Sequence, residues 1–75
     1  MLELRPNCEL CDVDLSPESR DVFICSFECT FCRHCTKTKL EGICPNCKGE
    51  LVRRPIRPVA SLKKYPASIH RVHPR

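Results

Sequence analysis

The chain has few of the residues that normally build a hydrophobic core. Its 75 residues include no tryptophan, one tyrosine, one methionine and three phenylalanines. A chain of this length buries too little apolar surface to be stable on hydrophobic burial alone, and small domains are usually held by disulfides or metals. Glycine is scarce too, with two residues, which excludes a glycine-rich phosphate loop. The sequence therefore predicts one small domain that depends on cross-links.

Long apolar runs are also missing. The first seven residues contain neither a basic stretch nor an apolar segment of signal-peptide length. No segment approaches the roughly 20 apolar residues that a membrane-spanning helix needs. We therefore expect a cytoplasmic protein with no membrane contact, and in a reducing cytoplasm cysteines remain thiols.

Cysteine is unusually abundant in this chain, and the spacing of the cysteines predicts metal binding. The eight cysteines form closely spaced sets, at Cys8, Cys11, Cys25, Cys29, Cys32, Cys35, Cys44 and Cys47. Two intervening residues let both thiolates of a tight turn bind one ion, and zinc accepts four thiolates in a tetrahedral set. Eight ligands make two closed sites with no open position, so we expect two structural zinc ions and no enzymatic activity. An iron–sulfur cluster and redox disulfides are the alternatives.

The spacing allows two ways of sharing the cysteines between the ions. Sequential sharing would group the first four and the last four. Interleaved sharing would give site 1 as Cys8, Cys11, Cys32 and Cys35, and site 2 as Cys25, Cys29, Cys44 and Cys47. We favour the interleaved form, because it places one pair at the start of a predicted helix, whose N-terminus favours thiolate charge. It also ties distant parts of the chain together.

The segments between the cysteines predict short elements of both kinds. We expect a lead-in strand at Leu2 and Leu4, strands over 22–24, 27–31 and 49–52, and a helix over 33–40. The strand at 22–24 is β-branched and aromatic, and Gly42 is suited to end the helix. The predicted fold over residues 1–52 is a small, metal-stabilised α+β domain with a short hairpin and one short helix.

The last third of the chain differs in charge from the rest. Residues 51–75 contain seven Lys or Arg and no acid, whereas residues 1–50 contain nine acids and six bases. Alternating arginine and proline favour an extended backbone. We interpret residues 53–75 as a basic, flexible tail. Nucleic-acid phosphates are one candidate partner for its cations, namely Arg53, Arg54, Arg57, Lys63 and Lys64.

The three histidines are not needed as ligands, because eight cysteines fill two sites. His34 lies between two predicted ligands and is interpreted as a surface residue of the helix. His70 and His73 form an H-x2-H motif, but no other residue of a metal-binding type lies near them. We therefore assign no third metal site.

The cysteine pattern resembles the cross-brace of RING-type zinc domains. The resemblance is carried by the order of the C-x2-C and C-x3-C sets, by Leu10 in the first pair, by Phe31 before Cys32, and by the closing Cys44-Pro45-Asn46-Cys47 followed by Lys48. It implies a RING-like or treble-clef fold. It also implies an alternative function, that of a ubiquitin ligase.

The chain departs from the RING pattern in two places. Cys29 stands where such domains usually have a histidine. The loop 36–43 is short and lacks the tryptophan that often helps to contact the conjugating enzyme. The ligase function would require Leu10, Pro45 and Lys48 to be exposed together on one face of the domain.

Over its length the chain also resembles a family of short bacterial proteins of unknown function. That resemblance rests on residues 2–8, 24–32 and 44–55. It implies a RING-like zinc fold in a bacterial cytoplasm and supplies no activity. The predicted function is a monomeric zinc-binding interaction module, or adaptor, with a protein partner.

Overall fold

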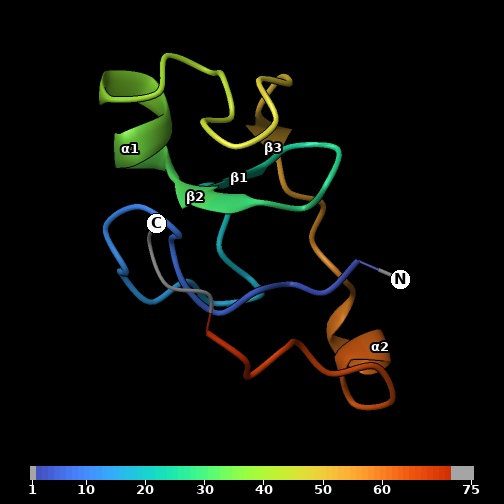
Figure 1. Ribbon diagram of the computed structural model, residues 1–75. Helices are drawn as coiled ribbons and strands as arrows, with labels where there is room; N and C mark the ends of the chain where they lie inside the picture. The colour runs from blue at the N-terminus through green and yellow to red at the C-terminus, as the bar shows by residue number, and fades with distance from the viewer. Residues whose placement is uncertain (1, 72–75) are drawn as a thin grey trace.

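A three-stranded antiparallel sheet forms the centre of the molecule (Figure 1). The computed structural model describes residues 2–71. In it, β1 (Val22–Ile24) lies between β2 (Thr30–Cys32) and β3 (Val52–Arg53). The prediction of a small α+β fold is therefore confirmed.

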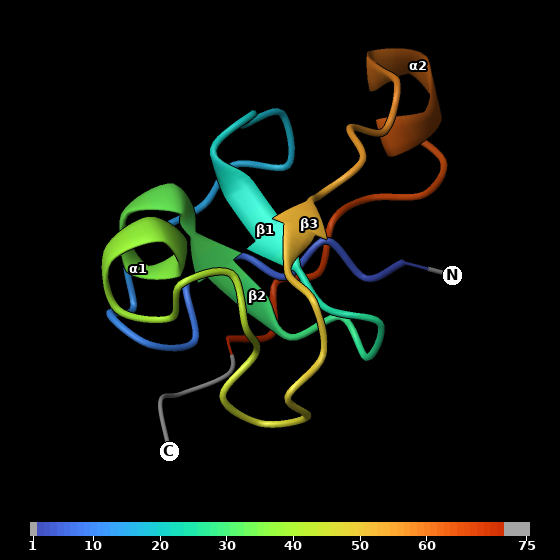
Figure 2. The same ribbon diagram turned by 90° about the horizontal axis from the view of Figure 1, so that it is seen from above.

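Of the two short helices, one lies against the sheet and the other lies away from it on the opposite side of the molecule (Figures 1 and 2). The first, α1 (Arg33–Thr38), follows β2 directly, and the second is α2 (Val59–Leu62). The sequence predicted only α1, so α2 is a correction to the prediction of one helix. No helix in the described part of the chain has the length and apolar character needed to span a bilayer.

The strand predicted over 22–24 is confirmed, whereas its neighbours are shorter or shifted. β2 begins at Thr30 rather than at residue 27, because the chain turns before it: the Glu28 amide donates to the Cys25 carbonyl at 3.0 Å. The last strand starts later than the predicted 49–52. The predicted lead-in strand is absent, and Leu4 has a left-handed φ of 54°, which interrupts an extended run.

The core is small and consists largely of cysteines. Phe31, at the centre of β2, is 1% exposed and packs with Leu51 and five buried cysteines. Phe31 lies opposite Phe23 in the sheet register. Since sulfur atoms occupy so much of this centre, its stability depends on whatever holds the sulfurs together.

Residues 53–71 run back along the N-terminal segment (Figures 1 and 2). The Ser68 amide donates to the Glu3 carbonyl at 2.9 Å. The Arg57 guanidinium donates to the carbonyls of Leu2 at 2.6 Å and Tyr65 at 2.7 Å. Arg71 reaches the loop after the first cysteine pair. The predicted boundary between residues 52 and 53 falls inside β3, and described residues after it contact the N-terminal segment. The flexibility of residues 53–75 stays a prediction.

Arg54 is the buried cation of this segment, with 1% of its surface exposed. Its guanidinium donates to the carbonyl oxygens of Arg5 and Ser16, each at 3.0 Å, and its amide donates to the Val22 carbonyl at 2.8 Å. Burial lowers the pKa of Arg54. This position corrects the interpretation of Arg54 as a tail cation for nucleic acid, because its charge faces main-chain carbonyls inside the protein.

Candidate metal centre

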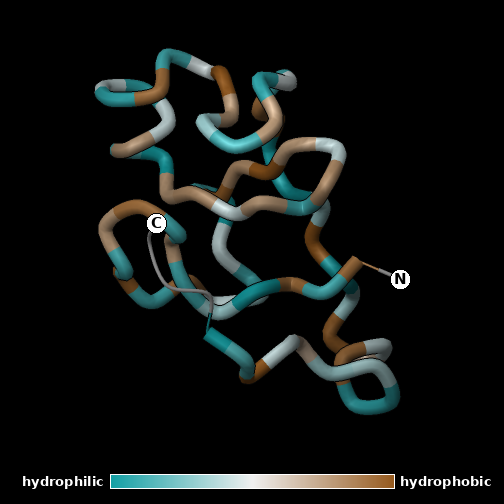
Figure 3. The backbone as a smooth tube through the Cα atoms, viewed as in Figure 1, coloured by the Kyte–Doolittle hydropathy of each residue, from teal (hydrophilic) through white to brown (hydrophobic). Residues whose placement is uncertain are grey.

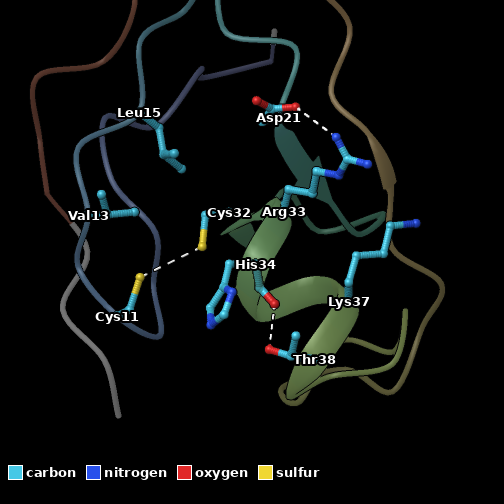
Figure 4. Close-up of a pocket in the computed structure, with 9 residues that line it drawn as sticks. All are labelled: Cys11, Val13, Leu15, Asp21, Cys32, Arg33, His34, Lys37 and Thr38. Carbon is cyan, nitrogen blue, oxygen red and sulfur yellow. Dashed lines mark hydrogen bonds and ion pairs between the residues drawn. The ribbon is translucent and has the colours of Figure 1, made fainter.

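Four cysteines from two distant parts of the chain meet at one point, which we call site 1. Their Sγ atoms all lie within 4.8 Å of one another, and they belong to Cys8, Cys11, Cys32 and Cys35. The sulfurs of Cys11 and Cys32 are 3.7 Å apart (Figure 4). Four thiolates around one zinc ion at about 2.3 Å have sulfurs about 3.8 Å apart. The Cys11–Cys32 separation therefore matches that of two ligands of one zinc ion, and all four sulfurs are close enough to hold a single metal ion.

Backbone turns position these sulfurs. The chain reverses after Cys8, where the Asp12 amide donates to the Cys8 carbonyl at 2.9 Å. Asp12 adopts a left-handed φ of 66°, which Asp tolerates better than most residues. Cys32 is the N-cap of α1, and its sulfur accepts the amide of Cys35 at 3.4 Å. The prediction that one pair lies at the helix start matches this geometry.

The thiols of site 1 differ in how readily they ionise. Burial raises the pKa of Cys32 and of Cys35. Burial acts on Cys8 in the same direction, but backbone N–H groups outweigh it and lower the pKa of Cys8 to about 7. Four thiolates at this distance repel one another strongly unless a cation neutralises them. A divalent cation bound among these sulfurs would offset that repulsion and favour the thiolate form.

A second group, which we call site 2, contains three cysteines. The sulfurs of Cys25, Cys44 and Cys47 lie within 4.8 Å of one another. Cys25 follows β1. Cys44 and Cys47 flank a turn in which the Lys48 amide donates a hydrogen bond to the Cys44 carbonyl at 2.9 Å. The Cys47 sulfur accepts the amide of Gly49 at 3.3 Å.

Gly49 is a residue of site 2 that sequence reasoning missed. A Cβ at this position would lie 3.2 Å from the Cys47 sulfur, closer than ordinary contact. Glycine lets the backbone approach the sulfur and donate to it. The sequence feature that could have indicated this role is the position of Gly49, two residues after the Cys44–Cys47 pair.

Cys29, the fourth predicted ligand of site 2, does not join this group. Its sulfur lies more than 4.8 Å from at least one of the other three and accepts a hydrogen bond from Asn46 Nδ2 at 3.5 Å. The spacing explains the difference. In the C-x2-C turns the second cysteine is three residues after the first, whereas after Cys25 that position is taken by Glu28, with a φ of 65°. Cys29 comes one residue later, and its sulfur lies against the turn that carries Cys44 and Cys47 without being within 4.8 Å of all three other sulfurs.

An open groove of about 740 Å³ lies beside site 1 (Figure 4). Val13 and Leu15 line it on the loop side, and the sulfurs of Cys11 and Cys32 lie at its base. Its helix side carries basic residues, among them Lys37. The lining is mainly apolar, with cationic side chains along one edge.

Other predicted residues are dispersed over the surface. His34 is exposed and lines the groove, and His70 is exposed, whereas His73 lies outside the described residues. Of the residues assigned to the ubiquitin-ligase alternative, Pro45 and Lys48 are exposed and Leu10 is half-buried against the core.

The five cations predicted for nucleic acid are not equivalent. Arg54 is buried, and Arg57 is engaged by two carbonyls. The three that remain exposed are Arg53, Lys63 and Lys64.

Comparison with known proteins places the chain among its relatives. Residues 1–57, which include all eight cysteines and Arg54, match the family described as "Protein of unknown function (DUF1272)". An uncharacterized protein of Rhizobium meliloti (strain 1021) is 69% identical over 72 residues, which cover 96% of this chain and 86% of the relative. No solved structure matches the chain. Together, the family match and the bacterial relative show that this chain belongs to the DUF1272 family of small, cysteine-rich proteins.

Proposed function

We propose that this protein is a binding module folded around two zinc ions in a RING-like cross-brace, and that it is not an enzyme. The four sulfurs of site 1, all within 4.8 Å of one another, carry the proposal. Soft thiolate ligands in a tetrahedral set favour zinc. The two groups also alternate along the chain, since Cys25 lies between the two pairs of site 1, and such alternation is the pattern of a cross-brace.

Site 1 supports a structural rather than a catalytic role. Four protein ligands fill the coordination sphere of zinc and leave no position for a substrate. When bound, the ion neutralises the thiolates and joins the first cysteine turn to α1. The residues of this chain then present a surface, and we propose that this surface is the functional part of the molecule.

Metal analysis combined with native mass spectrometry tests the zinc proposal directly. We expect two zinc ions per chain in protein purified without added metal, and no visible colour. Replacing Cys35 with serine is expected to reduce the content to one ion, since it removes one ligand from site 1 only. Iron with visible absorbance, or fewer than two metal ions in the unsubstituted protein, would contradict the proposal.

We also propose that the groove beside site 1 binds a partner segment in which apolar side chains are flanked by acidic ones. Val13 is 47% exposed in the groove wall, so an apolar surface is already present. Arg71 donates to Asp14 Oδ1 at 2.6 Å and to Asp12 Oδ1 at 3.0 Å, which offsets the negative charge of that loop. On the helix side, Arg33 pairs with Asp21 at 3.6 Å, and Lys37 adds one further positive charge, with its Nζ 5.3 Å from the centre of the Phe23 ring. An acidic, apolar segment complements this surface.

A labelled peptide with two leucines between pairs of glutamates tests the groove. We expect it to bind better than the same peptide with lysines, and less well as salt increases. Val13→Asp and Lys37→Glu should each weaken binding by about fivefold or more, the effect of roughly 1 kcal/mol. The matched variants Val59→Asp and Lys39→Glu change exposed residues outside the groove. The proposal would be contradicted if each groove variant lost no more affinity than its matched control variant. Equal binding of the glutamate and lysine peptides would contradict it as well.

A further inference from the structure

The segment that follows Arg54, residues 55–71, contributes nothing to the buried core, and we call it the strap. None of its residues is buried, and Ile69 is 95% exposed. It is connected to the N-terminal segment by the hydrogen bonds of Arg57 and Ser68. A segment with few buried apolar contacts and with hydrogen bonds open to water separates from its neighbours more readily than a core strand does. The strap can therefore leave the module while the sheet stays intact.

Arg71 fastens the end of the strap to the loop that forms one wall of the groove (Figure 1). Its guanidinium donates to Asp14 Oδ1 at 2.6 Å, to Asp12 Oδ1 at 3.0 Å and to the Asp12 carbonyl at 2.8 Å. The two aspartates flank Val13, which lines the groove. One residue of the strap therefore determines how much of the charge of these carboxylates is offset beside the groove.

The groove wall has its own support from the main chain. The Cys8 amide donates to the Val13 carbonyl at 2.9 Å, and the Leu15 amide donates to the Pro6 carbonyl at 2.8 Å. Neither of these bonds involves the strap. Separation of Arg71 is therefore expected to leave the shape of the wall in place and to change its charge.

We propose that the strap regulates the groove by setting the charge that the groove presents to a partner. With the strap docked, Arg71 offsets one of the two negative charges of Asp12 and Asp14. With the strap released, both charges are left uncompensated, while Lys37 on the helix side of the groove is unchanged. Release therefore shifts the preference of the groove from acidic toward basic segments. This proposal rests on the proposed binding of a partner segment at the groove.

Arg71→Ala in the full chain tests the charge effect with the glutamate and lysine peptides described above. We expect the glutamate peptide to bind more weakly and the lysine peptide more tightly, so that the ratio of their affinities falls by about fivefold, as expected when one exposed charge pair is lost. Lys63→Ala is the matched control, because it removes the same charge from an exposed position of the strap outside the groove. It should change the ratio by less than about twofold. Equal changes in the two variants would overturn the proposal.

A second substitution in the Arg71→Ala protein separates charge from shape. Asp14→Asn removes one of the two carboxylates that the missing guanidinium would have met, so the loop regains the net charge that it has with the strap docked. We expect the ratio of the two affinities to return to within about twofold of the wild-type value. A ratio that stays low in the double variant would show that charge is not the cause, and it would overturn the proposal.

Amide hydrogen exchange measures release of the strap itself, without any peptide. The Ser68 amide should exchange about two- to fivefold faster in Arg71→Ala than in wild type, because loss of the ion pairs raises the fraction of released strap. The Leu15 amide should exchange at the same rate in both proteins, because the wall keeps its own hydrogen bonds. Faster exchange at Leu15 would show that Arg71 supports the shape of the wall and would overturn the proposal, as would unchanged exchange at Ser68.

The groove proposal and the strap proposal fail in different ways. If the wild-type protein binds both peptides equally, the groove proposal fails, and the regulation proposed for it fails too. If the wild type prefers the glutamate peptide and Ser68 exchanges faster in Arg71→Ala, but the ratio of affinities does not change, only the regulatory role of the strap is wrong.

Discussion

Removal of both metal ions with a strong chelator is expected to unfold the sheet and α1 together. Structural zinc sites contribute about 10–16 kcal/mol of binding free energy, whereas a whole domain is stable by about 5–15 kcal/mol. The core around Phe31 contains too few aliphatic side chains to replace that contribution. We expect the amide resonances of residues 2–53 to collapse to the narrow range of an unfolded chain.

Native mass spectra recorded on the same samples provide the control, because they show when the metal has left. Adding two equivalents of zinc should restore the dispersed spectrum. A metal-free chain that keeps its dispersed amide resonances would show that the fold does not depend on zinc.

Arg54→Ala is expected to lower the free energy of unfolding by about 3 kcal/mol even when both sites are loaded. The substitution leaves the carbonyls of Arg5 and Ser16 without their donor, and a hydrogen bond from a charged group contributes about 1.5–3 kcal/mol. It also removes the largest fully buried side chain. Denaturant unfolding in excess zinc measures the loss, with metal content checked on the folded protein.

The adjacent Arg53 supplies a matched control. It is exposed in β3, so Arg53→Ala removes the same charge one residue away and should change stability by less than about 0.5 kcal/mol. If both substitutions have the same effect, net charge rather than the buried hydrogen bonds of Arg54 determines the loss.

The role of Arg54 illustrates what the sequence could not reveal. The strand at Val22–Ile24 and the helix α1 were predictable, because residue type and capping act over a few neighbours. Arg54 lies in a stretch of arginines and prolines whose composition is that of a solvated tail. The two carbonyls that it reaches are 49 and 38 residues away in sequence, and no local pattern indicates such contacts.

The cysteines were predicted better than the tail because their spacing encodes their geometry. The four sulfurs that the structure brings together at site 1 are the set predicted for it, and metal binding there remains a proposal. At site 2 the prediction treated Cys29 like the other ligands. The extra residue between Cys25 and Cys29 was the signal that the turn would differ, and the sequence could not show that Asn46 would donate to the Cys29 sulfur.

The interleaving of the two groups gives the chain an order of assembly during its own synthesis. All four sulfurs of site 1 exist once residue 35 has been made, whereas site 2 waits for Cys47, and Arg54 follows later still. An ion bound at site 1 closes the loop that carries Cys25, which lowers the entropic cost of meeting the cysteines that arrive last. In the proposed two-zinc fold, a nascent chain would have the ligands of its first ion while those of the second are still being translated, and Arg54 would follow afterwards.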